Sequence, residues 1–147
     1  MGTANANKQW FPTDTKERAR VNQFISWSSS HVRDAVDAYL SEMVWKKLQD
    51  LPVNDVAKEK AEETLRKNLQ VLEKALEERS TLVGEHITLC DLVIAEDLLD
   101  LELVEFDFGE LVNIQQWQFY VKQNVSSWDK VHQFFYQVFK PAVQKAL

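Results

Sequence analysis

The segment from Thr81 to Leu99, TLVGEHITLCDLVIAEDLL, constrains the fold of this chain more than any other. Thr88 is a favoured residue type at a helix N-cap, and Asp91 three positions later completes a T-x-x-D variant of the capping box. Ile87 before the cap and Leu92 after it have the spacing of a hydrophobic staple. The residues that follow are too uniformly apolar for a surface helix. The segment therefore predicts a buried helix with a strongly specified start.

The rest of the chain has few turn-forming residues. Glycine and proline occur three times each in 147 residues, and no stretch shows sustained alternation of apolar and polar side chains. A β-rich domain would need many more turns. Because helical periodicity runs through most of the chain, the sequence predicts an all-α bundle of about five to six helices. The expected helices span residues 15–49, 55–78, 89–103, 110–123 and 127–139.

The first of these helices is predicted to be long and bent. Three serines, residues 28–30, interrupt its apolar stripe, and a serine hydroxyl can bond to the preceding turn and bend a helix. We expect the bend between Ser28 and His31. The helix should end before Pro52, because proline disfavours a helical conformation in the residue before it. Pro141 either kinks the last helix or opens a further short one.

Length and composition limit the class of protein. We expect residues 1–9 to be a flexible N-terminal segment and residues 10–147 to form a single all-helical domain. The net charge of −6 argues against a nucleic-acid partner, because phosphate binding needs a basic surface. No apolar run approaches the length of a membrane span and no secretory signal is present, so we expect a cytoplasmic protein with no membrane partner.

The residues offer little for metal or redox chemistry. The single cysteine excludes an internal disulfide, and the three histidines lack the spacing of metal ligands, so no metal site is predicted. Cys90 is expected to pack as a small buried hydrophobic residue, and His132 to be half-exposed. The acidic residues of 96–102 and the charged face of 58–73 are expected to be solvated. Asp91, by contrast, should be well buried.

Several stretches resemble the C-terminal helical domain of cytosolic glutathione S-transferases. The pattern L-V-G-x-x-I-T-L-x-D-L of residues 82–92 is similar to that family's folding signature. Four further stretches, most of them theta-class-like, resemble family motifs: residues 10–22 (WFP followed by KERARVN), 24–27 (FISW), 114–117 (IQQW) and 131–135 (VHQFF). The resemblance implies the helical bundle of that domain, over nearly the whole chain.

The resemblance also implies a function. This half of a theta-like transferase would supply a hydrophobic substrate site, with walls from Phe24, Trp27, His31 and Phe134, and part of a dimer interface. Asn22 stands where theta-like enzymes have an aspartate that can face glutathione bound in the partner subunit. Glutathione would be the co-substrate, and no other cofactor is implied. Because the thioredoxin-like domain that activates the thiol is not represented, we expect no catalytic residue here and no activity from this chain alone.

A second hypothesis comes from another class of protein. Similar helical domains occur in the gamma subunit of the translation elongation factor complex and in aminoacyl-tRNA synthetases, where they assemble complexes and catalyse nothing. Trp10, Phe11, Phe106 and Phe108 would then form an exposed apolar edge for a protein partner or a thioredoxin-like half. The residues leave both hypotheses open.

Overall fold

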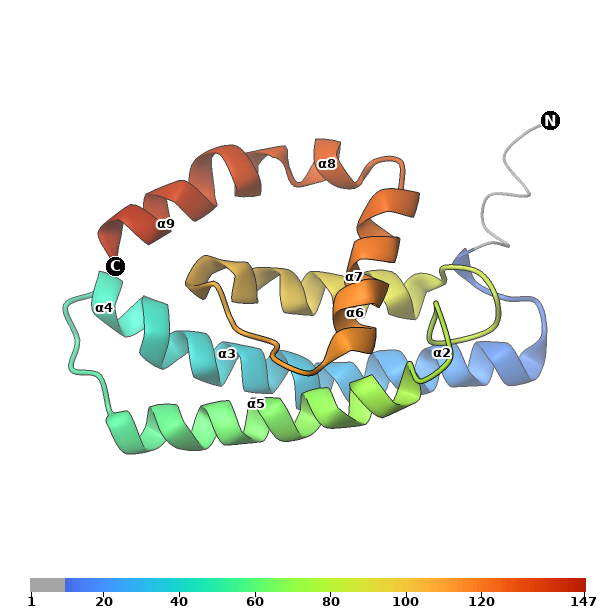
Figure 1. Ribbon diagram of the computed structural model, residues 1–147, viewed down its shortest axis with the longest axis horizontal. Helices are drawn as coiled ribbons and strands as arrows, with labels where there is room; N and C mark the ends of the chain where they lie inside the picture. Colours follow the sequence, from blue (N-terminus) through green and yellow to red (C-terminus); the bar gives the residue numbers. More distant parts are fainter. Residues whose placement is uncertain (1–9) are drawn as a thin grey trace.

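The computed structural model describes residues 10–147, and these residues form an all-α fold without a strand (Figure 1). This all-α arrangement confirms the predicted fold class. The predicted flexible segment 1–9 lies outside the described residues. None of the described helices combines the length and the apolar character needed to cross a membrane.

The first helical segment is long, and two π-helical stretches interrupt its α-helical hydrogen bonding. It begins as α2 (Thr15–Ser28), passes through the π-helical η1 (Ser29–Arg33), α3 (Asp34–Leu40) and π-helical η2 (Ser41–Trp45), and ends as α4 (Lys46–Leu48). Asp14 caps its start by accepting the backbone N–H groups of Lys16 and Glu17 at 3.0 and 2.9 Å.

The first π segment lies where the sequence predicts a bend. The Ser30 hydroxyl donates to the backbone carbonyl of Ser26 at 3.3 Å, as expected of a serine that bonds back to the preceding turn. Ser28 behaves differently, because its buried hydroxyl donates to the carboxylate of Asp97 on another helix. Thus only part of the serine run acts on its own helix.

Helix α5 (Asp55–Ala75) runs back along α3 (Figure 1). Asn54 caps it by accepting the N–H of Ala57 at 3.0 Å. Its predicted apolar stripe is buried against the first helical segment and the rest of the core, at Ala61, Leu65, Leu69, Leu72 and Leu76. This antiparallel pair forms the base of the bundle.

The predicted buried helix is α6 (Leu89–Leu99), which continues into the 3₁₀ turn η3 (Asp100–Val104). It contacts α2 and α7 (Val112–Asn124), and most of its side chains are buried. Because other helices pack on several of its sides, α6 carries apolar side chains nearly all round.

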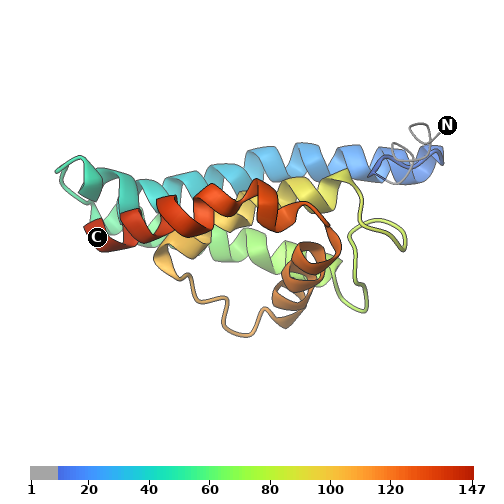
Figure 2. The same cartoon turned by 90° about the horizontal axis from the view of Figure 1, so that it is seen from above.

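The C-terminal part is less regular than expected. Instead of one helix over 127–139, the chain forms α8 (Trp128–Val131), the π-helical η4 (Phe135–Phe139) and α9 (Lys140–Ala146). Pro141 lies in the first turn of α9, so it opens a further helix, the second of the two predicted outcomes. In Figures 1 and 2 this arm covers the side of α6 that faces away from α5.

The expected solvated edge on α6 and η3 is found only in part: Glu96 is exposed, whereas Asp97, Asp100 and Glu102 are partly buried. Each acidic side chain there reaches a partner from another part of the chain, because the helix is surrounded by neighbours. Glu102 pairs with Lys122 on α7 and Lys140 on α9. The other pairs are Asp97 with Ser28, Asp100 with Arg33, and Glu96 with His132.

Three further expectations about exposure need correction. His132 is buried rather than half-exposed, since it stacks on Trp128 and bonds to Glu96. Phe106 is buried too, in edge contact with Tyr39, so it does not belong to an exposed apolar edge. The charged face of α5 is not simply solvated. Its Glu73 accepts the N–H groups of Asn113 and Ile114, both at 2.9 Å, and so caps α7.

Candidate functional site

Three of the four residues predicted to line a substrate site lie on one stripe of the first helical segment. Phe24, Trp27 and His31 follow one another at helical spacing along α2 and η1. The stripe borders α5: the backbone carbonyl of His31 accepts a hydrogen bond from the Asn68 side chain of α5 at 2.8 Å. The structure therefore places Phe24 and His31 beside the groove between α2–α3 and α5, with Trp27 between them on the same helical stripe, stacked on His31.

Trp27 and His31 form the middle of this stripe. Their rings stack with centroids 5.8 Å apart, and the His31 Nδ1 atom lies 3.1 Å from the backbone carbonyl of Trp27 and 2.9 Å from the Ser30 hydroxyl. Trp27 is half-buried and His31 is exposed. The pair offers a flat aromatic surface. Both hydrogen-bond partners of the His31 ring, Ser30 and Trp27, lie within the same helical turn, and they leave the second ring nitrogen free.

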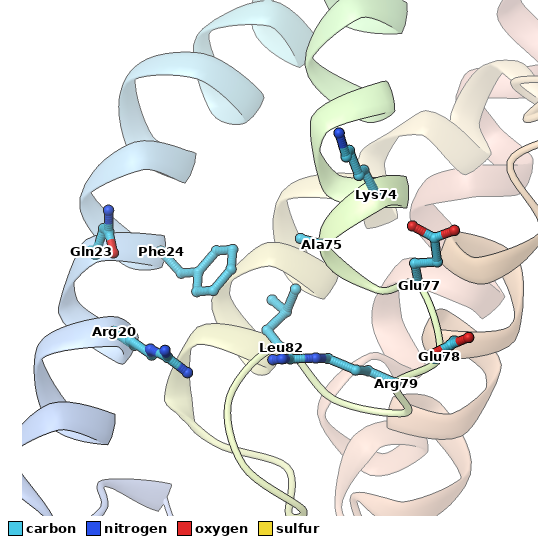
Figure 3. A pocket seen from close by; sticks show the side chains of 9 residues that line it. All are labelled: Arg20, Gln23, Phe24, Lys74, Ala75, Glu77, Glu78, Arg79 and Leu82. Carbon is cyan, nitrogen blue, oxygen red and sulfur yellow. The ribbon is translucent and has the colours of Figure 1, made fainter.

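Phe24 lies in a hollow at one end of the groove. The hollow has a volume of about 570 Å³ and is bordered by α2 on one side and by the last turn of α5 with the following loop on the other. Figure 3 shows Phe24 pointing from α2 toward Leu82 and Ala75, which with it form an apolar floor. Charged side chains surround that floor: Arg20, Lys74, Glu77, Glu78 and Arg79.

A second hollow, of about 670 Å³, lies further along the groove between α3 and α5. His31 borders it, and small side chains dominate its walls: Ala35, Ala38, Ala57 and Ala61. The two hollows thus lie on either side of the Trp27–His31 stack, on one face of the helix pair.

The structure does not bring Phe134 to this groove. Phe134 immediately precedes η4 in the C-terminal arm, and its side chain is 66 % exposed. Figures 1 and 2 show α6 between that arm and the α2–α3 segment. Val131 and Val138, three residues before and four residues after Phe134 in the same arm, are also exposed apolar side chains. Asn22 is exposed on α2.

The cap and staple residues form the buried anchor of the bundle. Asp91 is fully buried, and its carboxylate accepts the N–H groups of Leu82 and Thr88 and the indole N–H of Trp117, each at 2.9 Å. Thr88 also donates its hydroxyl to Asp91 at 3.0 Å. Of the staple residues, Ile87 is buried, and Leu92 is partly buried and packs against the hydrophobic core.

Cys90 does not provide a reactive thiol. It is fully buried beside Thr88, and this burial raises the pKa of its thiol to about 12. The thiolate that would act as a nucleophile is therefore scarce at neutral pH. Within residues 10–147, no three His, Cys, Asp or Glu side chains come close enough together to hold a metal ion.

The sequence reasoning missed two residues of the Phe24 hollow, Arg20 and Arg79. Arg20 precedes Phe24 by one helical turn, which is a signal that could have been used. Arg79 follows α5 after Glu78, whose backbone φ of 58° is left-handed. No sequence pattern indicates that this turn directs Arg79 back toward α2.

The arrangement of helices is that of a known protein class. The structure of human glutathione transferase theta-2 superposes with a TM-score of 0.82 at 24% sequence identity, covering 97% of this chain and 60% of that one. A delta-class glutathione transferase from Nilaparvata lugens superposes with a TM-score of 0.78 at 25% identity, covering 95% of this chain and 62% of that one. The fold is thus that of the helical domain of glutathione transferases.

The sequence places the chain in the same family. The sequence model of the family described as "Glutathione S-transferase, C-terminal domain" matches residues 34–122. Because this match covers more than half of the residues, the chain belongs to the glutathione S-transferase C-terminal domain family.

Its similar relatives include two kinds of protein. Mouse glutathione S-transferase theta-1 is 35% identical over 98 residues, which cover 61% of this chain and 38% of the mouse protein. Elongation factor 1-gamma-A of Xenopus laevis is 33% identical over 108 residues, covering 71% of this chain and 24% of the frog protein. The chain therefore spans well under half the length of these relatives.

Proposed function

We propose that this chain is the helical half of a theta-like glutathione transferase, which binds the hydrophobic co-substrate and contributes to a dimer interface. The match to the family over residues 34–122, together with the theta-class relatives, carries this proposal. The parent reaction would add the glutathione thiolate to an electrophile. The chain alone would be catalytically incomplete, because the family model that it matches is that of the C-terminal domain, and we expect activation of the glutathione thiol to come from a thioredoxin-like domain.

The groove between α2–α3 and α5 is the proposed place for apolar contacts with the electrophile. Phe24 and the Trp27–His31 stack provide aromatic surfaces that remain partly accessible, and both hollows of the groove adjoin them. Phe134 would contribute from a separate surface, where it would have to meet the substrate or a partner independently of the other three. Asn22 is proposed as a polar contact to glutathione in a neighbouring subunit, through its amide.

The test measures conjugation of glutathione to a generic aryl halide. We expect no rate above the uncatalysed reaction with this chain alone, and a measurable rate when it is mixed with a separately expressed thioredoxin-like half of a theta-class transferase. Trp27→Ala should then raise KM for the electrophile more than KM for glutathione. Lys130→Gln, an exposed change on α8, is the matched control. Activity of the isolated chain would contradict the proposed incompleteness.

A second candidate function is that of an assembly module without catalysis. The similarity to elongation factor 1-gamma-A favours it, as do the exposed apolar side chains of the C-terminal arm, Val131, Phe134 and Val138. Sedimentation velocity measures whether the chain self-associates or remains a monomer. If Phe134→Ser abolishes self-association and mixing with the thioredoxin-like half produces no conjugation, the assembly module is the better account.

A further inference from the structure

We propose that His132 and Glu96 form a pH-sensitive latch, which holds the C-terminal arm (residues 128–146) against α6 and loosens as the pH rises above neutrality. The latch is independent of any transferase activity, because both residues belong to this chain. The arm also carries the exposed apolar side chains considered above for assembly, Val131, Phe134 and Val138. The attachment of the arm to α6 therefore decides how that surface is presented.

Both ring nitrogens of His132 lie beside hydrogen-bond acceptors. The Nδ1 atom is 2.8 Å from the backbone carbonyl oxygen of Trp128, and the Nε2 atom is 2.8 and 2.9 Å from the two carboxylate oxygens of Glu96. A neutral imidazole has one N–H, so it can donate to only one of these acceptors, and its other nitrogen then directs a lone pair at an oxygen. The protonated ring, with two N–H groups, is the form that satisfies both contacts.

The surroundings of His132 fix the ring in this position. The residue is 7% exposed, its ring centroid lies 4.2 Å from that of Trp128, and the ring of Tyr136 meets it edge-on. Burial disfavours a charged ring, and the adjacent carboxylate offsets that cost. The Glu96 side chain remains 46% exposed, so water can replace the ring as the partner of its carboxylate when the arm moves away.

Other charged and titratable groups surround the latch, and Glu96 is the one that bonds to the ring. On α8 itself, Asp129 and Lys130 are exposed. On η4, the Tyr136 hydroxyl accepts an indole N–H at 3.3 Å. On α7, which packs against α8, Lys122 pairs with a carboxylate of η3.

The latch lies near the start of the arm, and other attachments lie toward its C-terminal end. There, Phe139 stacks on Trp45 and α9 packs against η3. Near the start, the buried ring of Trp128 and the bond between His132 and Glu96 join the arm to the rest of the bundle. Loss of this bond should therefore loosen α8 and the beginning of η4 while the other helices stay folded.

The direction of the pH effect follows from the two acceptors. Because the docked arm favours the protonated ring, its stabilisation is fully present below a pH of about 6.5, where a free histidine is also protonated. The stabilisation is lost as the pH rises above that value, since the neutral ring keeps only one of its two contacts.

Amide hydrogen exchange of the intact chain, followed by NMR at pH 6 and pH 8 and expressed as protection factors, tests the latch. The amides of Val131, His132 and Tyr136 report on it, because each is hydrogen-bonded within the arm. We expect their protection to fall about tenfold between the two pH values, as for loss of one hydrogen bond to a charged group, while α5 and α6 keep theirs. His132→Gln should remove this pH dependence, because glutamine does not titrate.

Glu96→Gln distinguishes the latch from simple packing. Its amide can donate to Nε2 of the neutral ring, whose Nδ1–H then donates to the Trp128 carbonyl, so the arm should stay protected at pH 8. A purely structural role for Glu96 predicts lower protection at both pH values instead. His86→Gln is the matched control, because it removes an exposed histidine from the loop before α6 and should leave the tenfold fall unchanged.

The proposal is overturned if the arm of the unaltered chain is equally protected at pH 6 and pH 8. It is also overturned if His132→Gln keeps the pH dependence, or if Glu96→Gln shows the same fall as the unaltered chain. Circular dichroism checks that each variant folds. The comparison of the two pH values on the unaltered chain decides the question even if one variant does not fold.

Discussion

The carboxylate of Asp91, in the first turn of α6, accepts the indole N–H of Trp117 on α7 at 2.9 Å. Both side chains are buried, with Asp91 at 0% and Trp117 at 1% exposure. The same carboxylate also accepts the N–H of Thr88 within its own cap and that of Leu82 in the preceding loop. One side chain thus joins the start of a helix, the loop before it and a neighbouring helix.

This relationship predicts a large loss of stability when Asp91 is truncated. Asp91→Ala should lower the free energy of unfolding by about 3–5 kcal/mol, because three buried N–H donors lose their acceptor at once. Trp117→Phe keeps the ring and deletes a single donor, so it should cost about 1–2 kcal/mol. Urea unfolding of both variants and of the double variant measures the coupling. Equal losses for the two single variants would show that the carboxylate acts only through the tryptophan.

Gly84 occupies a left-handed backbone conformation, with φ of +69°. A Cβ there would lie 3.3 Å from the Glu17 Oε1 atom, so Gly84→Ala meets both backbone strain and a close contact. We expect a loss of about 1–2 kcal/mol in thermal unfolding. Gly109→Ala is the control, because its φ of +56° is similar and nothing lies within 4 Å of the added atom. Gly84→Ala and Gly109→Ala should differ less in stability loss when Glu17→Ala is also present. If that difference stays the same, the contact with Glu17 plays no part.

Glu73 stabilises the start of α7 from a helix 40 residues earlier. Leu111, the N-cap residue of α7, makes no side-chain cap, and Glu73 accepts the N–H groups of Asn113 and Ile114 in its place. Glu73→Ala should therefore cost about 1–2 kcal/mol, as does loss of an ordinary N-cap. Amide hydrogen exchange should show the largest increase in exchange rate at these two amides. Glu59→Ala, an exposed change on the same helix, should leave both amides protected; equal exchange in the two variants would refute this role.

The ion pairs of Glu102 predict a pH dependence of stability. Burial opposes ionisation of this carboxyl, but Lys122 and Lys140 outweigh it and hold its pKa below the ordinary value. The folded state therefore holds this proton less tightly than the unfolded chain. The stabilisation is fully present above the unfolded pKa of about 4.3 and is lost as the pH falls through the lower folded pKa.

We expect Glu102→Gln to lower the free energy of unfolding by about 1 kcal/mol at pH 7, a modest value because the group is only half-buried. The difference from the unaltered chain should shrink toward zero as the pH approaches 3. Denaturation series at several pH values measure it. A difference that stays constant down to that pH would mean that lost packing, rather than lost charge, causes the destabilisation.

The buried thiol of Cys90 predicts slow chemical modification. With its pKa raised to about 12 by burial, the thiolate fraction at pH 8 is about a thousandfold lower than for a free thiol. A disulfide reagent should therefore react with the native chain only on the timescale of unfolding and should react rapidly in concentrated urea. Because the chain has one cysteine, the absorbance change of a chromogenic disulfide reagent reports modification of Cys90 alone. Rapid labelling of the native chain would contradict the burial.

Local signals in the sequence account for the helices and where most of them begin. Asp14, Asn54 and Asp91 each bond to N–H groups within three residues, so their roles follow from residue type and spacing. The scarcity of turn-forming residues and the apolar stripes likewise indicate an all-α fold from neighbouring residues alone. The C-terminal arm was predicted less well, because no strong cap separates α8 from η4.

The contacts between helices depended on the tertiary structure. Whether Glu73 faces solvent or the start of α7, and whether Arg79 meets Arg20, depends on how far each helix is rotated about its axis and where each loop returns the chain. Small differences in the rotation of a helix about its axis accumulate along its length, and no local sequence pattern predicts them. The sequence alone therefore set the helices, the buried cap and the family. Only the packed structure separated Phe134 from Phe24 and brought two arginines to one hollow.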